Sequence, residues 1–165
     1  MTPDEICELV SRSRAATPGV APPRLWVWSA DAILYRRAPL ADHWPAIALD
    51  LAGQLVRQDD GPVAGVACTV EGSALLDVSA EEAATIHPGT IRSLVDERVR
   101  NVIQVLSWTA EDGARSIIVP FRVGEDGCGM FDPAERLELP GGTVTDGAGG
   151  DRWYETVAAV AATLL

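Results

Sequence analysis

The chain has 165 residues, is 47% hydrophobic and carries a formal net charge of −11. Its length and apolar content predict a single compact domain, 1–165, with a buried core, and they exclude a disordered chain. The negative charge argues against nucleic acid and against an anionic membrane surface as partners, because both are bound through excess positive charge.

The sequence shows no signal for a membrane or for export. No run of about eighteen apolar residues occurs, and the acidic N-terminus lacks the basic region of a signal peptide. All 13 basic residues are arginine, a bias typical of bacterial genomes of high GC content. We therefore expect a cytoplasmic bacterial protein. Two local groups of arginines could still bind a small anionic ligand. They are Arg36-Arg37 and Arg92, Arg98 and Arg100.

The three cysteines, Cys7, Cys68 and Cys128, are widely spaced, and none belongs to a CxxC motif. In a cytoplasmic protein this pattern predicts three reduced thiols. The cysteines and the two histidines also lack metal-ligand spacing, so we expect neither a metal nor a cofactor.

The N-terminal region predicts a helix followed by a hairpin. Residues 3–15 have the hydrophobic period of an amphipathic helix, and with the proline-rich lead-in they make up 1–23. Residues 25–28 and 32–36 are rich in aromatic and branched side chains. They predict two paired strands joined by a turn at Asp31.

A second helix is predicted over 45–57, where Pro45 suits the first helical turn. The segment is apolar nearly all round. A helix of that kind is usually buried on most sides, so we expect it at the centre of the domain.

The middle of the chain predicts strands. Residues 63–70 and 73–78 have strand composition, and Glu71-Gly72 is taken as the turn between them. Residues 79–86 are expected to be irregular or a short helix. Residues 90–108 fit one capped helix or two strands, because hydrophobic periodicity alone does not decide between them.

The remaining chain predicts a hairpin, a long loop and a helix. A turn at 111–113 leads into a strand at 116–123, in which Pro120 indicates a sheet edge or a bulge. Residues 124–150 are rich in glycine and acids and predict a loop region with a short strand at 136–139. The helix over 151–165 has Asp151 as its expected N-cap, and its expected inner face is Trp153, Val157, Val160, Ala161 and Leu164.

The most distinctive polar arrangement is His43 just before the second helix, with Asp50 seven residues further on. Seven residues is about two helical turns, so both side chains could share one side. Histidine can remove a proton near neutral pH, and a carboxyl group among leucines can hold one and donate it. Free N–H groups of the first helical turn, at Ala46, could polarise a carbonyl oxygen. These parts suit proton abstraction beside a thioester carbonyl; a surface histidine and an aspartate at a helix edge are the alternative.

The chain resembles the hotdog fold of acyl-thioester dehydratases and thioesterases over residues 4–123. In the dehydratases a His-Phe-Pro segment precedes the central helix, which carries an acidic residue. His43-Trp44-Pro45 is similar to that segment, and Asp50 is similar in place to that acid. Downstream, "HPGTIRSLVDERVRNVIQVLSWTAEDGARSIIVPF" resembles the family's Pro-Gly turn and long antiparallel strands. Two departures are Ala46 in place of the family's glycine and an offset aspartate in place of glutamate.

The resemblance implies roles and partners. His43 would act as the base, Asp50 as the acid and the amide of Ala46 as the oxyanion donor. The protein would be an enzyme, or a catalytically degenerate subunit, in fatty-acid-like or polyketide-type specialised metabolism. An acyl carrier protein or a small apolar ligand would be its partner. Hotdog domains usually pair sheet edges, so the resemblance also implies a homo- or heterodimer.

Three further candidates have simpler structural explanations. Cys68 with His87 could form a nucleophilic pair, but a mid-strand cysteine is usually a buried thiol. The stretch "VGEDGCGMF" follows a strand as a phosphate loop would, yet it lacks the GK[ST] ending. Trp26 and Trp28, with Trp44 nearby in sequence, could line an apolar pocket or an interface, or simply pack against the central helix.

The sequence therefore predicts an α+β domain in which an antiparallel sheet packs around a central buried helix, hotdog-like, with helices at both ends. A Roadblock- or profilin-like sandwich is the alternative if 90–108 is one helix. Three functions stay open: acyl-thioester handling, a non-catalytic interaction or regulatory module, and a cofactor-independent cyclase or isomerase with a tryptophan-lined pocket. The interaction module predicts an apolar patch away from His43 and no deep pocket beside it.

Overall fold

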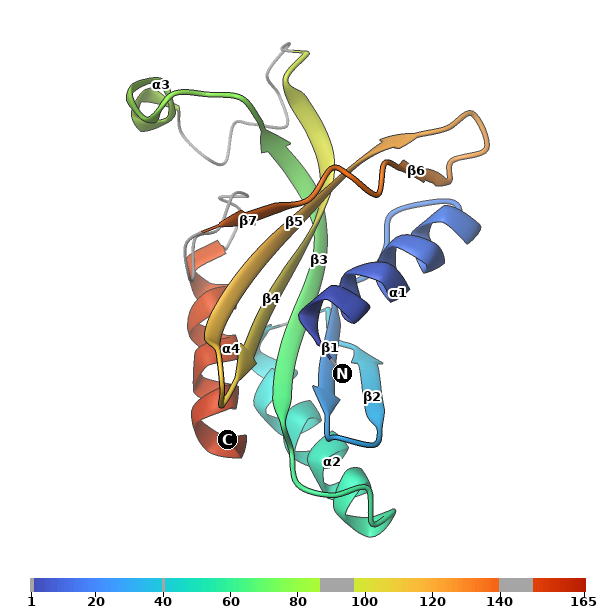
Figure 1. Ribbon diagram of the computed structural model, residues 1–165, viewed down its shortest axis with the longest axis vertical. Coiled ribbons are helices and arrows are strands. Elements are labelled where there is room, and N and C mark those ends of the chain that lie inside the picture. Colours follow the sequence, from blue (N-terminus) through green and yellow to red (C-terminus); the bar gives the residue numbers. More distant parts are fainter. Residues whose placement is uncertain (1, 40, 87–96, 140–149) are drawn as a thin grey trace.

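The structure, a computed structural model, describes residues 2–39, 41–86, 97–139 and 150–165 (Figure 1). Its helical elements are α1 (Pro3–Ala16), the 3-10 turn η1 (Ala41–His43), α2 (Trp44–Arg57), α3 (Ala80–Thr85) and α4 (Gly150–Leu164). Its strands are β1 (Arg24–Trp28), β2 (Ile33–Arg37), β3 (Gly65–Leu75), β4 (Val99–Thr109), β5 (Gly113–Val123), β6 (Gly129–Phe131) and β7 (Leu137–Leu139). The predicted α+β class with helices near both ends is confirmed.

The strands form one antiparallel sheet in the order β2-β1-β3-β4-β5-β6, and β7 pairs with a separate stretch of β5. The three long strands β3, β4 and β5 have 11 residues each and form the middle of the sheet. The predicted hairpin of β1 and β2 is confirmed, with Trp26 opposite Tyr35. No helix in the described part of the chain is both long and apolar enough to cross a membrane.

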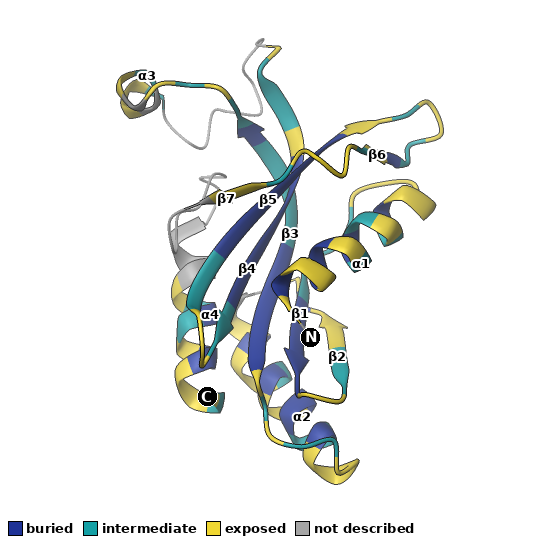
Figure 2. Ribbon diagram, viewed as in Figure 1, coloured by how far each residue is buried: buried dark blue, intermediate teal, exposed yellow. Residues whose placement is uncertain are grey.

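Each face of the sheet is covered by different helices (Figure 1). One core, on the α1 face, joins α1 to Trp26 and Trp28 of β1 and to residues of β4 and β5. The other core joins α2 and α4 to Leu25 and Val27 of β1 and to β3. Successive side chains of a strand point to opposite faces, so β1 supplies both cores. Figure 2 shows that the middle strands are mostly buried and that α1 and α2 expose their outer surfaces.

The composition of the second helix had indicated burial on most sides, but the structure shows that it is buried on one face only. Residues 44–57 bury one face against the sheet and α4, through Trp44, Ala48, Leu51, Ala52 and Leu55. On the outer face, Leu49 and Val56 are exposed. Alanine and leucine favour helix whether or not they are buried, so helical composition alone does not report burial. The expectation of a centrally buried helix is corrected to a helix packed on one face of the sheet.

The predicted turn at Glu71-Gly72 is wrong, because β3 runs without interruption from Gly65 to Leu75. Its pairing with β4 is regular over that whole length, and Gly72 lies opposite Val102. Glu71 is an acidic residue within a strand because its side chain faces an arginine on α1. A charged residue beside a glycine resembles a turn in sequence, and only the tertiary partner distinguishes the two.

That partner is Arg14, which forms an ion pair with Glu71 beneath α1. Arg14 Nε lies 2.9 Å from Glu71 Oε2, and the two side chains are 3% and 7% exposed. Arg14 Nη1 also donates to the carbonyl oxygens of Thr17 and Gly127, at 3.1 and 2.8 Å. Glu71 Oε2 accepts a further bond from the backbone N–H of Ala21 at 2.8 Å. The pair thus connects α1, β3, the 17–21 segment and the turn between β5 and β6.

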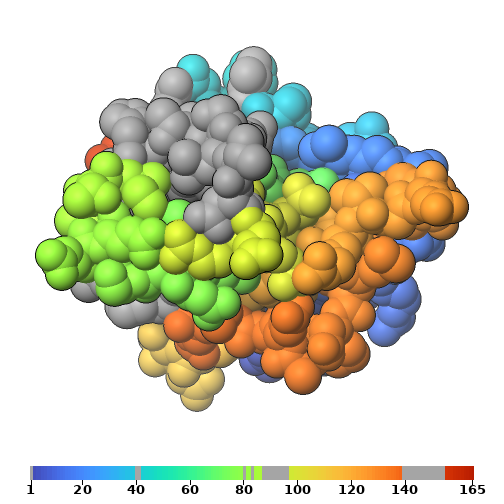
Figure 3. Space-filling model, turned by 90° about the horizontal axis from the view of Figure 1, so that it is seen from above, coloured from blue at the N-terminus to red at the C-terminus, as the bar shows by residue number. Residues whose placement is uncertain are grey.

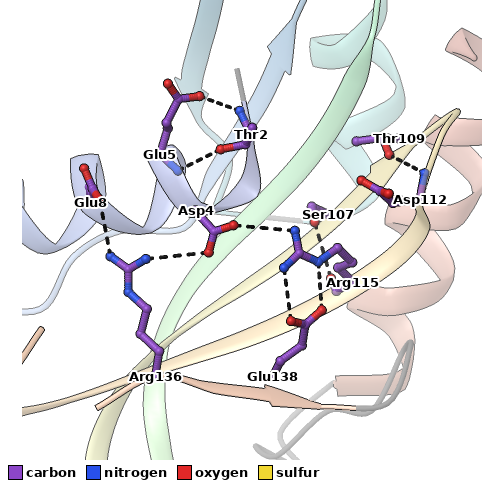
Figure 4. Close-up of polar contacts among 10 residues, drawn as sticks. All are labelled: Thr2, Asp4, Glu5, Glu8, Ser107, Thr109, Asp112, Arg115, Arg136 and Glu138. Carbon is purple, nitrogen blue, oxygen red and sulfur yellow. Dashed lines mark hydrogen bonds and ion pairs between the residues drawn. The ribbon is translucent and has the colours of Figure 1, made fainter. Parts of the chain in front are cut away.

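The N-terminal turn of α1 is held at the surface (Figure 4). Thr2 and Glu5 form a capping box, in which each side chain accepts from the other residue's backbone N–H. Asp4 lies 3.6 Å from both Arg115 of β5 and Arg136 before β7. Arg115 in turn makes two hydrogen bonds to Glu138, at 2.8 and 3.1 Å. These partly exposed pairs connect the first turn of α1 to β5 and to the segment before β7, and each contributes little to stability.

Residues 90–108 are not one helix, because Val99–Thr109 form β4. The condition for the Roadblock- or profilin-like sandwich is therefore not met, and the strand predicted at 102–109 is confirmed. Most of the strand predicted at 90–98 lies outside the described residues. The segment 79–86, expected to be irregular or a short helix, contains the short helix α3.

The C-terminal predictions hold with small changes. The turn at 111–113 joins β4 to β5. Pro120 lies between the stretches of β5 that pair with β7 and with β6, so it occupies a local edge as predicted. The short strand predicted at 136–139 is β7, and β6 within the glycine-rich stretch was not predicted. The last helix begins at Gly150, so Asp151 is inside it and is not the N-cap. Of its predicted inner residues, Val157, Val160 and Ala161 are buried and Leu164 is partly buried, whereas the side chain of Trp153 lies outside the described part of the structure.

We predict that Glu71→Gln lowers the free energy of unfolding by about 3–5 kcal/mol, because it leaves the buried Arg14 charge without its carboxylate. Chemical denaturation, analysed with one m-value for all variants, measures the change in the free energy of unfolding. The matched control is Glu138→Gln, which removes a carboxylate that is 56% exposed and should cost less than about 1 kcal/mol. Equal losses for the two variants would contradict a special role for the buried pair.

Candidate functional site

His43, the last residue of η1, and Asp50 of α2 are both exposed, and Asp50 is bound to other side chains. Asp50 Oδ2 lies 2.8 Å from Arg36 Nη1 of β2 and accepts a hydrogen bond from Gln54 Nε2 at 3.0 Å. His43 is the N-cap residue of α2, and its side chain does not cap the helix. Neither residue lines any of four hollows on the described surface. Asp50 is thus engaged by Arg36 and Gln54, and none of these four hollows joins it to His43.

The neighbours of His43 have structural roles. Trp44 is fully buried, and its indole N–H donates to the carbonyl oxygen of Ala38 at 2.9 Å. This bond anchors the start of α2 to the end of the β1–β2 hairpin. Ala46 is exposed on the first turn of α2.

The three tryptophans that were grouped as a pocket wall lie on two faces of the sheet. Trp26 and Trp28 share the α1 face, as strand alternation predicts, whereas Trp44 belongs to the core beneath α2 and α4. Trp28 lies directly over Gly65 of β3, where a Cβ atom would collide with its indole ring. Both β1 tryptophans pack against α1 and not against α2. Trp28 is therefore a core residue, and Trp26 alone reaches a hollow.

The cysteines do not form a catalytic site among the described residues. Cys68 is completely buried, and burial raises the pKa of its thiol well above the ordinary value. Burial likewise raises the pKa of Cys7 to about 12. All three thiols are free. His87, the proposed partner of Cys68, lies outside the described residues.

The glycine-rich stretch forms the turn between β5 and β6 rather than a phosphate loop. Gly124 and Cys128 are joined by a backbone hydrogen bond of 2.9 Å. The side chain of Asp126 accepts from the N–H of Cys128 at 2.9 Å. Gly127 has φ +79, a conformation that favours glycine, and its carbonyl oxygen accepts from Arg14. The turn is therefore tied into the Arg14–Glu71 pair.

A further candidate site is a groove between α1 and the β1–β2 hairpin. It has a volume of about 470 Å³ and is lined by Leu9, Arg12, Ser13, Ala16, Arg24, Trp26, Ile33 and Tyr35. The α1 residues form one wall, because their spacing places them on a single helical stripe. The β1 and β2 residues form the floor, since each faces the same side of the sheet. We call this hollow the α1–β2 groove.

The floor of the groove is aromatic and partly rigid. The rings of Trp26 and Tyr35 lie 4.7 Å apart, and the Trp26 indole N–H donates to Thr69 Oγ1 at 3.0 Å. Trp26 is 2% exposed, so it presents an edge, whereas Tyr35 is 56% exposed. Together they offer a flat apolar surface that opens toward the edge of the sheet.

The groove is also positively charged on a strongly acidic chain. Arg12 and Arg24 line it, and its lining residues include no acid. Arg24 lies over the Tyr35 ring at 5.5 Å and donates to Ser13 Oγ at 3.4 Å. Its Nε atom is buried and has no hydrogen-bond partner among the described residues. Neither Arg12 nor Arg24 forms an ion pair with a described residue, so both can bind an anionic group.

A second hollow, of about 430 Å³, contains several arginines but is nearly neutralised. Arg98, Arg100, Arg122 and Arg136 line it together with Asp77, Glu97 and Glu135. Figure 3 shows the face on which the start of β4 adjoins the segment after β5. Arg100 pairs with Glu135 at 3.0 Å, and Arg98 pairs with Glu82 at 2.7 Å. The arginine cluster noted at Arg98 and Arg100 is thus largely engaged in holding loops together.

Sequence reasoning identified one floor residue of the groove, Trp26, and missed the rest. The usable signal was the alternation along the hairpin, which places Arg24, Trp26, Ile33 and Tyr35 on one face. The α1 wall could not be assigned, because no sequence pattern specifies which face of the sheet α1 covers.

No family model, curated protein or solved structure matches this chain. Within the described ranges, no three histidine, cysteine or acidic side chains are grouped to hold a metal ion. The candidate site therefore depends on geometry and charge alone.

We predict that one thiol per native chain reacts with a disulfide reagent such as Ellman's reagent. Cys128 is half-buried, so a reagent can reach it, and burial and the nearby Asp126 raise its pKa. Cys7 and Cys68 are buried, and burial raises their pKa values too. All three should react after unfolding, and Cys128→Ser should abolish the native reaction. Rapid native labelling of Cys68 near neutral pH would support a nucleophilic role instead.

Proposed function

We propose that the protein is a non-catalytic interaction module, and that the α1–β2 groove binds an acidic segment of a partner protein that carries an aromatic or large aliphatic side chain. The main support is that one groove combines an aromatic floor, in which Tyr35 is exposed, with two arginines that have no carboxylate partner among the described residues. Tryptophan, tyrosine and arginine are the residues that most often dominate protein interfaces.

The lining of the groove favours binding over catalysis. It contains no histidine, cysteine or acid that could act as a base or a nucleophile. The groove is an open trough beside a sheet edge, which suits a side chain of a polypeptide. Arg24, whose guanidinium lies over the Tyr35 ring and has no carboxylate partner in the described part of the chain, can pair with an incoming carboxylate.

Charge supports an acidic partner. The chain as a whole has a net charge of −11, so an acidic partner would be repelled by most of its surface. The groove, with Arg12 and Arg24, and the neighbouring Arg37 of β2 form a local exception. An acidic segment would be directed to this place, and its association should weaken as salt screens the arginines.

The expected result of a display selection against random short peptides is enrichment of acidic peptides that contain an aromatic or large aliphatic residue. Tyr35→Ala and Arg24→Gln should each lower the affinity for the selected peptides by at least about tenfold, as measured by fluorescence anisotropy. The reason is that aromatic and arginine residues at interfaces commonly contribute more than about 1 kcal/mol to binding. Affinity should also fall as salt rises.

The control for this experiment is Arg57→Gln, which makes the same change of charge at an exposed position on α2, away from the groove. It should leave peptide affinity within about twofold, because it changes only the long-range field. Selection of basic or neutral peptides, or equal losses for Arg24→Gln and Arg57→Gln, would contradict the proposal.

The acyl-thioester hypothesis is the second candidate, in the form of a hotdog-type enzyme or degenerate subunit that acts with an acyl carrier protein, as a dimer. It is supported by the antiparallel sheet and by a helix that starts directly after His43. The first turn of α2 also offers backbone N–H groups beside Ala46. The cyclase or isomerase hypothesis has less support, because only Trp26 of the three tryptophans lines a described hollow.

The acyl-thioester hypothesis predicts that the protein dehydrates or hydrolyses acyl-carrier thioesters and that His43→Ala abolishes this turnover. Loss of the general base would lower the rate by about 10²–10⁴-fold. Mass spectrometry of acyl-carrier substrates provides the measurement, with Arg57→Gln again as the control. We expect no turnover by the wild-type protein. Turnover that depends on His43 would overturn the interaction-module proposal.

A further inference from the structure

Strand β2 is an open edge of the sheet beside the groove. Among the described residues it pairs only with β1 and ends the strand order on that side. Its last three residues, Tyr35, Arg36 and Arg37, are exposed. An open edge presents unpaired backbone N–H and C=O groups, which can pair with another strand. The groove floor and this edge are formed by the same short strand.

The hydrogen-bond pattern of the hairpin shows which backbone groups are available. The N–H of Ser29 donates to the carbonyl oxygen of Ala32 at 2.9 Å, and the N–H of Ala38 donates to that of Pro23, also at 2.9 Å. In an antiparallel pair, residues bonded to the neighbouring strand alternate with residues that are not. Positions 32, 34, 36 and 38 therefore bond to β1. The N–H and C=O groups of Ile33, Tyr35 and Arg37 point away from β1, to the open edge.

We propose that the acidic partner segment binds as an added antiparallel strand on β2, bonded to the backbone of Ile33, Tyr35 and Arg37. This inference rests on the proposed function and specifies how the partner is held. The same three residues direct their side chains to the groove face, because they alternate with positions 34 and 36. Backbone pairing along the edge and side-chain binding in the groove are therefore compatible in a single pose.

This pose sets a sequence pattern for the partner segment. A residue directly opposite Tyr35 projects into the groove, where an aromatic or large aliphatic side chain would contact the Trp26–Tyr35 floor. A residue opposite Arg37 projects to the same face two positions away, and an acid there would form a cross-strand pair. On the other face, Arg36 is already paired with Asp50, so that side requires no charge. The expected motif is an acid and an aromatic or aliphatic residue separated by one position.

A second copy of this chain is a less suitable occupant. When two β2 edges overlap fully in an antiparallel pair, Tyr35 faces Tyr35 and Arg37 faces Ile33 of the other copy, so no carboxylate lies opposite either arginine. The chain's own β2 sequence, ILYRR, also contains no acid.

The test uses the tightest peptide from the display library and residue-resolved amide hydrogen exchange of the full chain. Strand addition predicts that exchange of the Ile33, Tyr35 and Arg37 amides slows by up to about a hundredfold when the peptide is at about 100 times its Kd. The Leu34 and Arg36 amides already bond to β1 and should change little. Protection without this alternation would overturn strand addition and leave groove binding intact.

A pair of variants provides the independent readout. Arg37→Ala removes the side chain and keeps the N–H, whereas Arg37→Pro removes both, at an edge position whose N–H faces away from β1. Arg37→Pro should bind about fivefold to tenfold more weakly than Arg37→Ala, as expected for one lost hydrogen bond. Thermal unfolding of both variants checks that they are folded. If Arg37→Pro does not fold, the exchange pattern of the wild-type protein alone tests strand addition.

The outcomes separate the two proposals. If both Arg37 variants are folded and bind the peptide equally well, strand addition is overturned. Groove binding would still be supported by weaker binding of Tyr35→Ala and Arg24→Gln. Failure of the library to yield any acidic peptide would overturn both. Sedimentation that shows a dimer of the chain, dissociated by Arg37→Pro but not by Arg37→Ala, would assign the edge to a second copy.

Discussion

The ion pair between Arg14 and Glu71 determines where α1 lies, and the candidate site follows from that position. Charges this deeply buried are tolerated only when their hydrogen-bonding groups are paired. Here Arg14 bonds Glu71, Thr17 and Gly127, and its guanidinium also lies 5.2 Å from the centre of the Phe121 ring. The arrangement exists only when α1, β3 and the β5–β6 turn have all reached their final places.

The same helix serves the core and the groove with different faces. Ile6, Cys7 and Val10 of α1 are buried against the sheet. Leu9, Arg12, Ser13 and Ala16 lie to one side and form the wall of the groove. Since Arg14 fixes the rotation of α1 about its own axis, it also fixes the side chains that face Trp26 and Tyr35. Arg14 therefore positions the site without contacting it.

The sequence was sufficient for elements whose signals are local. The hairpin of β1 and β2, the turn at 111–113, α1 and the inner face of α4 were all predicted from periodicity and turn residues. It was insufficient where a residue's role depends on a distant partner. Glu71-Gly72 has turn composition, and only Arg14, far away in sequence, makes Glu71 a strand residue. The burial of the second helix was overestimated for a similar reason, since no local pattern shows that the sheet covers one of its faces only.

The candidate site divides in the same way. His43 and Asp50 were selected by their spacing on one helix, yet the structure pairs Asp50 with Arg36, which the linear pattern does not place beside it. Trp26 was correctly placed on a strand face shared with Trp28. Its neighbours in the groove come from α1, and their approach is a property of packing between elements. A site formed by two elements that are separated in sequence was therefore beyond the reach of motif reasoning.

The continuous run of β3 has a consequence for folding. Alternate residues of this strand serve opposite cores, with Cys68 beneath α2 and α4 and Ala67 beneath α1. A slip of one residue against β4 would exchange these two sets and turn the Glu71 carboxylate away from Arg14, to the face covered by α2 and α4. Mispaired hairpins of β3 and β4 would thus carry an uncompensated charge into an apolar layer. Glu71, in the middle of the strand, therefore helps to specify the register of β3 against β4.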